Sequence, residues 1–293
     1  MRRPANALTT FVGCELKLIY FGTPAAAVPP LEALVGAGHE IALVVTQPDR
    51  RRGRGRGLVA SPVKAAALVH GLPVATPVKA REIVDHVRSL DADLGVVVAF
   101  GQILPKVLLE AIPGGLVNVH YSLLPRWRGA APVERAILAG DVDTGVCVMA
   151  VDETLDTGAV YARESLAINA DENAGDLHAR LNALGTELLV RTIPDVLSAV
   201  PEPQRGETTY AEKLTVDEFE LDLSRPAADL VRLVRAGNPR PGAWLEFEDG
   251  RMKVWKAHVE DGRFVPDTLQ PPGKRAMPYA AWRAGHRGED PFG

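Results

Sequence analysis

The chain has 293 residues, a formal net charge of −4 and 46% hydrophobic residues, values typical of a globular protein long enough for two domains. No apolar run approaches the roughly 20 residues of a membrane span, and the first residues lack the pattern of a secretory signal. With only two cysteines, Cys14 and Cys147, a disulfide framework is excluded, so we expect a cytoplasmic protein without a membrane partner.

Short apolar segments in the first two thirds of the chain predict the strands of a buried, mostly parallel sheet. They cover residues 16–21, 41–46, 94–100, 116–120 and 146–151. Helix signals lie between them: Ser61-Pro62 is an N-cap followed by proline, and Gly71 closes the same helix. The alternation predicts a doubly wound α/β domain over residues 16–198, and residues 1–15 precede it as an extension.

A second, smaller domain is expected over residues 209–293. A polar, proline-bearing stretch suits a linker over residues 199–208. Beyond it a helical pattern covers residues 226–235, and two alternating runs meet at Asp249-Gly250, a strong hairpin signal.

The segment "IYFGTP" at residues 19–24 follows the first expected strand, where nucleotide-binding enzymes carry a phosphate loop. It has one glycine instead of a G-x-G-x-x-G fingerprint, so a hydride-transfer enzyme is disfavoured. Either Gly22 borders a ligand, or it only lets the strand pass into the following helix.

The strongest candidates for catalysis are Asn118, His120 and Asp156. Asn118 and His120 are two residues apart at the end of an expected strand, so their side chains share one face, and Asp156 follows another strand at a similar level. An amide, an imidazole and a carboxylate without a serine or cysteine nucleophile suit acyl transfer directly to an external amine. No cluster with metal-ligand spacing is present in the sequence, so we expect no metal.

The combination of these motifs closely resembles the methionyl-tRNA formyltransferases, within the wider family of 10-formyltetrahydrofolate-dependent formyltransferases. The segments that carry the resemblance are "FGTP", "TQPDRRRGRGRGL", "SPVK", "NVHYSLLPRWRGAAP", "LDTG" and "TYAEKL". It extends from about residue 16 to residue 277, and it implies a Rossmann-like catalytic domain joined by a linker to an OB-like β-barrel.

The resemblance also implies roles for individual residues. Asn118 and His120 would stabilise the oxyanion, and Asp156 would organise proton transfer. The donor 10-formyltetrahydrofolate would bind against Ser122, Leu123, Leu124 and Pro125, and the acceptor would be the α-amine of methionyl initiator tRNA. We expect a monomer.

The stretch "DRRRGRGRG" at residues 49–57 concentrates five arginines in a mildly acidic chain. In the family this loop enters the acceptor end of the tRNA, which implies RNA contacts for Arg50, Arg51, Arg52, Arg54 and Arg56. Arginine suits this task because its planar fork binds phosphate and stacks on unpaired bases. A solvated charge run without a partner is the alternative.

The second domain departs from the family pattern. The segment between residues 262 and 269 is short, so the barrel is expected to be truncated, and Pro266 should weaken a strand there. A shortened domain would suit a smaller acceptor, such as a nucleotide-linked aminosugar, which leaves an aminosugar formyltransferase as the alternative function. A non-enzymatic RNA-binding protein would explain the arginines but not Asn118, His120 and Asp156.

Overall fold

The computed structural model of the chain describes residues 15–51, 57–248 and 250–293. The extension expected over residues 1–15 lies outside them except for its last residue, as do Arg52, Arg54, Arg56 and Asp249. The chain forms two compact units, one of residues 1–117 with 189–200 and the other of residues 118–188 with 201–293. The four-part division expected from the sequence follows other boundaries and stays a prediction.

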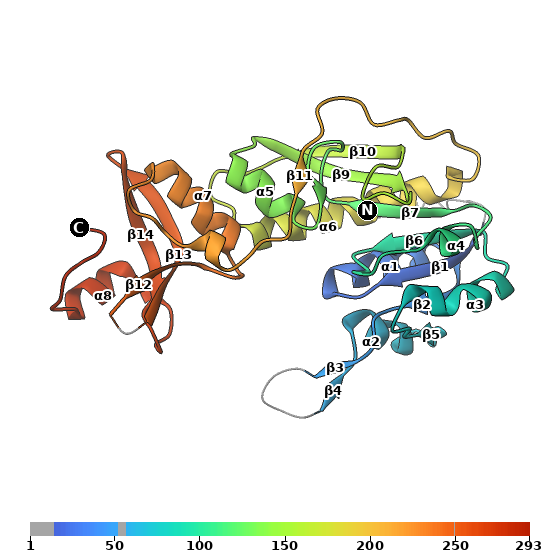
Figure 1. Cartoon of the computed structure of the whole chain (residues 1–293), viewed down its shortest axis with the longest axis horizontal. Helices are drawn as coiled ribbons and strands as arrows, with labels where there is room; N and C mark the ends of the chain where they lie inside the picture. The colour runs from blue at the N-terminus through green and yellow to red at the C-terminus, as the bar shows by residue number, and fades with distance from the viewer. Residues whose placement is uncertain (1–14, 52–56, 249) are drawn as a thin grey trace, which may run out of the picture. The chain divides into compact units, whose positions relative to one another are not determined.

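The main sheet has seven strands in the order β10-β9-β7-β6-β1-β2-β5 (Figure 1). Strand β1 pairs in parallel with β2 and β6, β2 pairs in parallel with β5, and β10 is antiparallel to β9. The strands are β1 (Lys17–Gly22), β2 (Glu40–Val45), β5 (Val74–Ala75), β6 (Leu94–Val98), β7 (Leu116–His120), β9 (Asp143–Ala150) and β10 (Val160–Ala167). The expected mostly parallel α/β sheet is confirmed, and the antiparallel edge strand β10 is an addition to it.

Helices connect these strands, as the alternation in the sequence predicts (Figure 1). They are α1 (Val28–Gly36), α2 (Pro62–Val69), α3 (Val84–Ser89), α4 (Lys106–Leu109), α5 (Pro132–Ala139) and α6 (Ala174–Thr192). Single turns of 3-10 helix lie at η1 (Ala25–Ala27), η2 (Ala80–Ile83), η3 (Ile193–Asp195) and η4 (Asp217–Phe219). Among the helices of the described residues, none has the length and apolarity to cross a membrane.

The transition from β1 into η1 explains the single glycine of "IYFGTP". A Cβ atom on Gly22 would lie 2.8 Å from the ring of Tyr20 and 2.9 Å from the Cβ atom of Ala27, closer than side chains pack. The hydroxyl of Tyr20 in turn donates to the carbonyl of Ala27 at 2.6 Å. Close packing therefore accounts for Gly22 without a ligand.

Helix α2 begins as its sequence signals predict. Ser61 is the N-cap, and its side chain accepts a hydrogen bond from the Lys64 amide at 3.0 Å. The same hydroxyl lies 2.7 Å from the hydroxyl of Thr46, which is fully buried at the end of β2. Ser61 thus joins the helix to the sheet edge from which the arginine-rich segment departs.

The C-terminal part of the second unit is a four-stranded antiparallel sheet in the order β12-β13-β14-β15 (Figure 1). Its elements are α7 (Ala227–Gly237), β12 (Ala243–Phe247), β13 (Gly250–Glu260), β14 (Arg263–Gln270), β15 (Met277–Pro278) and α8 (Tyr279–Gly285). Pro266 lies within β14 opposite Ala257, beside two register shifts, so the strand accommodates it with an irregular ladder. The described strands form this open sheet and no closed barrel.

We predict that Ser61→Ala lowers the free energy of unfolding by about 2 kcal/mol, because it removes a helix cap and the partner of a buried hydroxyl. Urea unfolding followed by circular dichroism measures the change. Ser89→Ala is the matched control: Ser89 is an exposed serine that bonds only to the local carbonyl of His86, so its loss should stay within about 0.5 kcal/mol. Equal losses in the two variants would contradict the role given to Ser61.

Candidate active site

His120 is the last residue of β7, at the carboxyl end of the strand. Its Nε2 lies 2.9 Å from the carbonyl oxygen of Trp127. Since a carbonyl can only accept, Nε2 carries the hydrogen and donates it, which leaves Nδ1 as the unprotonated nitrogen of the neutral ring. Nδ1 faces Asp156, with 3.7 Å between Nδ1 and Oδ2 of the carboxylate.

Asp156 lies in the loop between β9 and β10 and is held in an unusual backbone conformation. Its φ is +52°, in the left-handed region that residues with a side chain seldom adopt. Its Oδ2 accepts a hydrogen bond from the Gly129 amide at 2.8 Å. Two residues on, a Cβ atom on Gly158 would lie 1.9 Å from the carbonyl oxygen of Ala150, so the loop closes against β9 only because residue 158 is glycine.

The imidazole and the carboxylate are both largely buried, with side-chain exposures of 7% for His120 and 13% for Asp156. When the ring takes up a proton, both of its nitrogens become donors and Nδ1 faces a negative charge. The pair can therefore accept one proton from a neighbouring group and hold it between two buried atoms. This arrangement suits general acid–base chemistry at a largely buried position.

Asn118 lies two residues before His120 on β7 and shares its face of the strand. Its side chain is half-buried, and within the described part of the chain it has no hydrogen-bond partner. An amide in that state has two hydrogens to offer to a ligand oxygen. The structure thus brings His120 and Asp156 together and places Asn118 on the strand that carries His120.

The turn that supplies the carbonyl to His120 is itself fixed. Trp127 has a φ of +62°, and its amide donates to Oγ1 of Thr209 at 2.9 Å. Its indole Nε1 donates to Asp141 at 2.8 Å, and Asp141 also receives two hydrogen bonds from Arg126. Backbone and side chain therefore hold the Trp127 carbonyl in the position that orients His120.

Ser122, Leu123, Leu124 and Pro125, the residues expected to line the folate site, mostly face inward. Ser122 is fully buried and donates to the Arg126 carbonyl at 2.6 Å, and Pro125 is buried too. Leu124 packs in the core with Cys147 and Met149, while Leu123 is half-buried. Their side chains shape the loop beside His120, and their contact with folate stays a prediction.

The residue after His120 begins a polar cluster that joins β7 to two helices. Tyr121 donates to Asn182 of α6 at 2.7 Å, and burial raises the pKa of its phenol to about 12. Its ring meets His178 edge-on, and His178 lies 3.1 Å from Glu134. Burial raises the pKa of Glu134, but the hydrogen bond and charge of His178, a backbone hydrogen bond and the charge of Arg135 together leave the pKa below its usual value. These contacts fasten the strand end to α5 and α6.

Of the arginine-rich segment, the structure describes Arg50 and Arg51. Both are exposed on the short strand β3 (Arg50–Arg51), which pairs with β4 (Leu58–Val59). Arg52, Arg54 and Arg56 lie between these strands, outside the described residues. Their contacts with RNA stay predictions.

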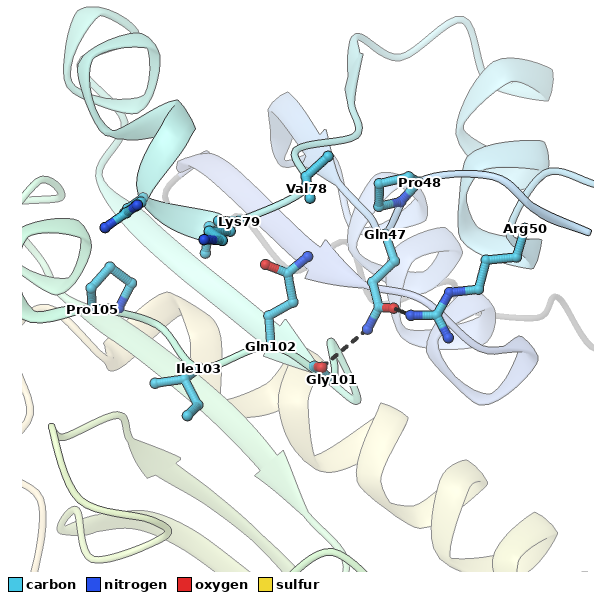
Figure 2. A pocket seen from close by; sticks show the side chains of 11 residues that line it. Gln47, Pro48, Arg50, Val78, Lys79, Gly101, Gln102, Ile103 and Pro105 are labelled. Carbon is cyan, nitrogen blue, oxygen red and sulfur yellow. Dashed lines mark hydrogen bonds between the residues drawn. The ribbon is translucent and has the colours of Figure 1, made fainter. Parts of the chain in front are cut away.

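A cavity of about 560 Å³ lies in the first unit, and it was not expected from the sequence. Its wall includes Gln47, Arg50, Lys79, Arg81, Gln102 and Ile103. Figure 2 shows Gln47 between Arg50 and the Gly101 backbone: its amide nitrogen donates to the Gly101 carbonyl at 3.1 Å, and its oxygen accepts from the Arg50 guanidinium. Three cations, two amides and the 89% exposed Ile103 suit a ligand that combines carboxylates with an apolar ring.

These cavity residues come from three separate segments, so no single motif marks them. A weak signal is present, because Gly101 and Gln102 follow β6 at the carboxyl end of a parallel strand. Across residues 15–51, 57–248 and 250–293, no group of three or more histidine, cysteine or acidic residues is placed to hold a metal ion.

Most of the chain is similar to proteins of one known family. Residues 16–193 match the family described as formyl transferase, and residues 213–277 match the formyl transferase C-terminal domain. The chain is 48% identical over 259 residues to the methionyl-tRNA formyltransferase of Roseobacter denitrificans, covering 87% of this chain and 85% of that protein. It is 51% identical over 251 residues to that of Halorhodospira halophila, covering 84% and 81% of the two chains.

Solved structures of other proteins are similar to this chain in fold. Phosphoribosylglycinamide formyltransferase from Bacillus halodurans is 26% identical with a TM-score of 0.54, covering 62% of this chain and 95% of that one. The N-formyltransferase from Helicobacter canadensis, solved with folinic acid and dTDP-3-aminofucose, is 16% identical with a TM-score of 0.65 and covers 86% and 96%. From the matched residues and these relatives, the chain belongs to the formyl transferase family.

Proposed function

We propose that this protein transfers the formyl group of 10-formyltetrahydrofolate to the α-amine of methionyl initiator tRNA. The observation that carries the proposal is the buried pair of His120 and Asp156 beside an amide without a partner, in a chain about half identical to methionyl-tRNA formyltransferases. The relative that was solved with an aminosugar nucleotide shares the fold at 16% identity, which gives the aminosugar alternative weaker support.

The reaction joins the amine nitrogen to the formyl carbon and then breaks the bond from that carbon to N10 of the folate. Negative charge develops on the formyl oxygen when the amine attacks. The Asn118 amide has hydrogens to donate to this oxygen, and the His120 ring gains a positive charge once Nδ1 has taken up the proton of the amine. These residues stabilise the charge without a covalent bond to the enzyme.

One proton must leave the attacking amine, and N10 of the folate must gain one. Asp156 is the acceptor that we propose, and His120 shares the proton across the 3.7 Å between Oδ2 and Nδ1. Because Trp127 occupies Nε2, the ring exchanges its proton through Nδ1 alone. The pair itself supplies charge and proton transfer, so we infer no requirement for a metal.

We further propose that the cavity of the first unit binds the glutamate tail of the donor. That tail carries two carboxylates next to an aromatic ring, and Arg50, Lys79 and Arg81 supply cations beside an exposed isoleucine. Arginine can bind a carboxylate with two parallel hydrogen bonds, which orients the ligand as well as attracting it.

We assign the arginines of residues 50–56 to the RNA. Arg50 and Arg51 lie at the base of the hairpin, on strands whose side chains face solvent. Their charges would bind phosphates near the acceptor end of the tRNA. Since aminoacyl-tRNA is a cytoplasmic substrate, we place the enzyme in the cytoplasm, and we expect it to act as a monomer.

We expect the purified protein to formylate methionyl initiator tRNA with 10-formyltetrahydrofolate as donor, because the site can stabilise an oxyanion and accept a proton. Release of N-formylmethionine from the tRNA, measured by mass spectrometry, detects the product. Nucleotide-linked aminosugars incubated under the same conditions are the control. A formylated sugar with an unmodified tRNA would replace this proposal with the aminosugar alternative.

Asp156→Asn should lower turnover by about 10²–10⁴-fold, because it removes the charge that accepts the proton. The asparagine oxygen still accepts from the Gly129 amide, so thermal unfolding should hardly change. Asp152→Asn is the matched control, since Asp152 is an exposed carboxylate of the same loop and should keep full turnover. Turnover near wild type in Asp156→Asn would remove Asp156 from the mechanism.

Arg81→Ala should weaken binding of a non-reactive folate analogue about tenfold, the loss of roughly 1.4 kcal/mol of charge-assisted bonding. Calorimetric titration of the free enzyme gives the dissociation constant. Arg88→Ala removes an exposed arginine of α3 that pairs with Asp85 and does not line the cavity, so its affinity should stay unchanged. If Arg81→Ala weakened tRNA binding and left folate binding intact, the cavity would belong to the acceptor.

A further inference from the structure

Residues 202–211, which overlap the segment expected to be an extended linker, form hydrogen bonds near the candidate active site at several points. Glu202 and the first residue of β10, Val160, exchange two backbone hydrogen bonds of 2.8 and 2.9 Å. Farther along, the Thr209 carbonyl accepts from the Arg128 amide at 2.9 Å, and β11 (Tyr210–Ala211) pairs in parallel with β8 (Arg128–Gly129). Glu202, Thr209 and β11 are therefore bonded to segments that adjoin or contact Asp156.

Gln204 lies within this segment and forms hydrogen bonds through both the nitrogen and the oxygen of its side-chain amide. Its amide nitrogen donates to the carbonyl of Asp156 at 2.9 Å and to the carbonyl of Gly158 at 2.8 Å. Its oxygen accepts two hydrogen bonds from the Arg128 guanidinium, at 3.0 Å from Nε and 2.6 Å from the terminal nitrogen. The side chain is half-buried, and nothing in these contacts requires a ligand.

The hydrogen bonds of Gln204 connect the two segments that hold the Asp156 carboxylate. Arg128 precedes Gly129, whose amide donates to Oδ2 of Asp156, while Gln204 holds the backbone of Asp156 itself. One side chain thus connects the strand that bonds the carboxylate to the loop that carries it. The loop needs such a connection because Asp156 has a positive φ, a conformation that persists only where its surroundings impose it.

We infer that Gln204 is a positioning residue that fixes the Asp156 carboxylate opposite His120. The expected effect on turnover rests on the proposed function. The expected effect on the position of the Asp156 loop does not depend on any substrate. Glutamine is required by the pattern of partners, since two carbonyls need donors and a guanidinium needs an acceptor. Glutamate at this position keeps the shape and the bond to Arg128, but it offers no hydrogen to the two carbonyls.

Gln204→Glu is the test, because it removes the hydrogens donated to the Asp156 loop and keeps an acceptor for Arg128. A shift of the Asp156 carboxylate by about 1 Å is expected to lower kcat about 10²-fold, with the KM of donor and tRNA within about threefold of wild type. Protonation of the introduced carboxyl group restores one donor, so the deficit should narrow as the pH falls toward the pKa of that group. A merely structural loss would not depend on pH in this way.

Thr208→Glu is the matched control: it adds the same charge at an exposed position of the same segment and should leave kcat unchanged. Gln204→Met keeps the length of the side chain but has neither donor nor acceptor, so it should lose turnover without recovering at low pH. Hydrogen exchange of residues 154–158, measured without substrate, should be faster in both Gln204 variants and unchanged in Thr208→Glu.

Normal kcat in Gln204→Glu, or exchange at residues 154–158 that matches wild type, would overturn the inference. A wild-type enzyme that formylates neither tRNA nor aminosugar would instead refute the proposed function. The exchange measurement still decides in that case whether Gln204 holds the loop. A variant that failed to fold would be recognised by its thermal unfolding, and Gln204→Met would then carry the test.

Discussion

A buried carboxylate beside a buried imidazole is the constraint on which the rest of the site depends. A charge removed from water is costly unless hydrogen bonds and a counter-charge surround it. Asp156 is accommodated by the Gly129 amide and by His120, and His120 by the Trp127 carbonyl. Each of these partners is in turn held by a contact with the segment of residues 202–211, directly or through a neighbour. The segment that the sequence marks as a connection between domains is, in the folded chain, hydrogen-bonded to the residues around Asp156.

Much of the catalytic strand can be predicted from the sequence, because local rules govern it. The apolar pattern predicts the strand over residues 116–120 with the bounds that the structure has, and the two-residue period correctly puts Asn118 and His120 on one face. The cap at Ser61 follows from chemistry within four residues. Where a structural feature depends on residues that are close in the sequence, the pattern of residue types is enough to predict it.

The rest of the site depends on contacts between distant segments, which no local pattern encodes. Gln204 contacts Asp156 across 48 positions, and the cavity of the first unit joins segments near residues 47, 80 and 102. The buried position of Leu124 also depends on Cys147, Met149 and Val160, which lie more than 20 residues away in the sequence. From the sequence alone, residues 122–125 resemble a binding motif and residues 202–211 resemble a linker. In the structure, Ser122 and Gln204 instead form hydrogen bonds with other residues of the protein.

Charge is distributed unevenly in a chain that is acidic overall. Three cations line the cavity of the first unit, and the exposed Arg50 contributes both to that cavity and to the base of the arginine-rich hairpin. Both proposed substrates are polyanions, and local positive charge attracts such ligands in spite of a net charge of −4.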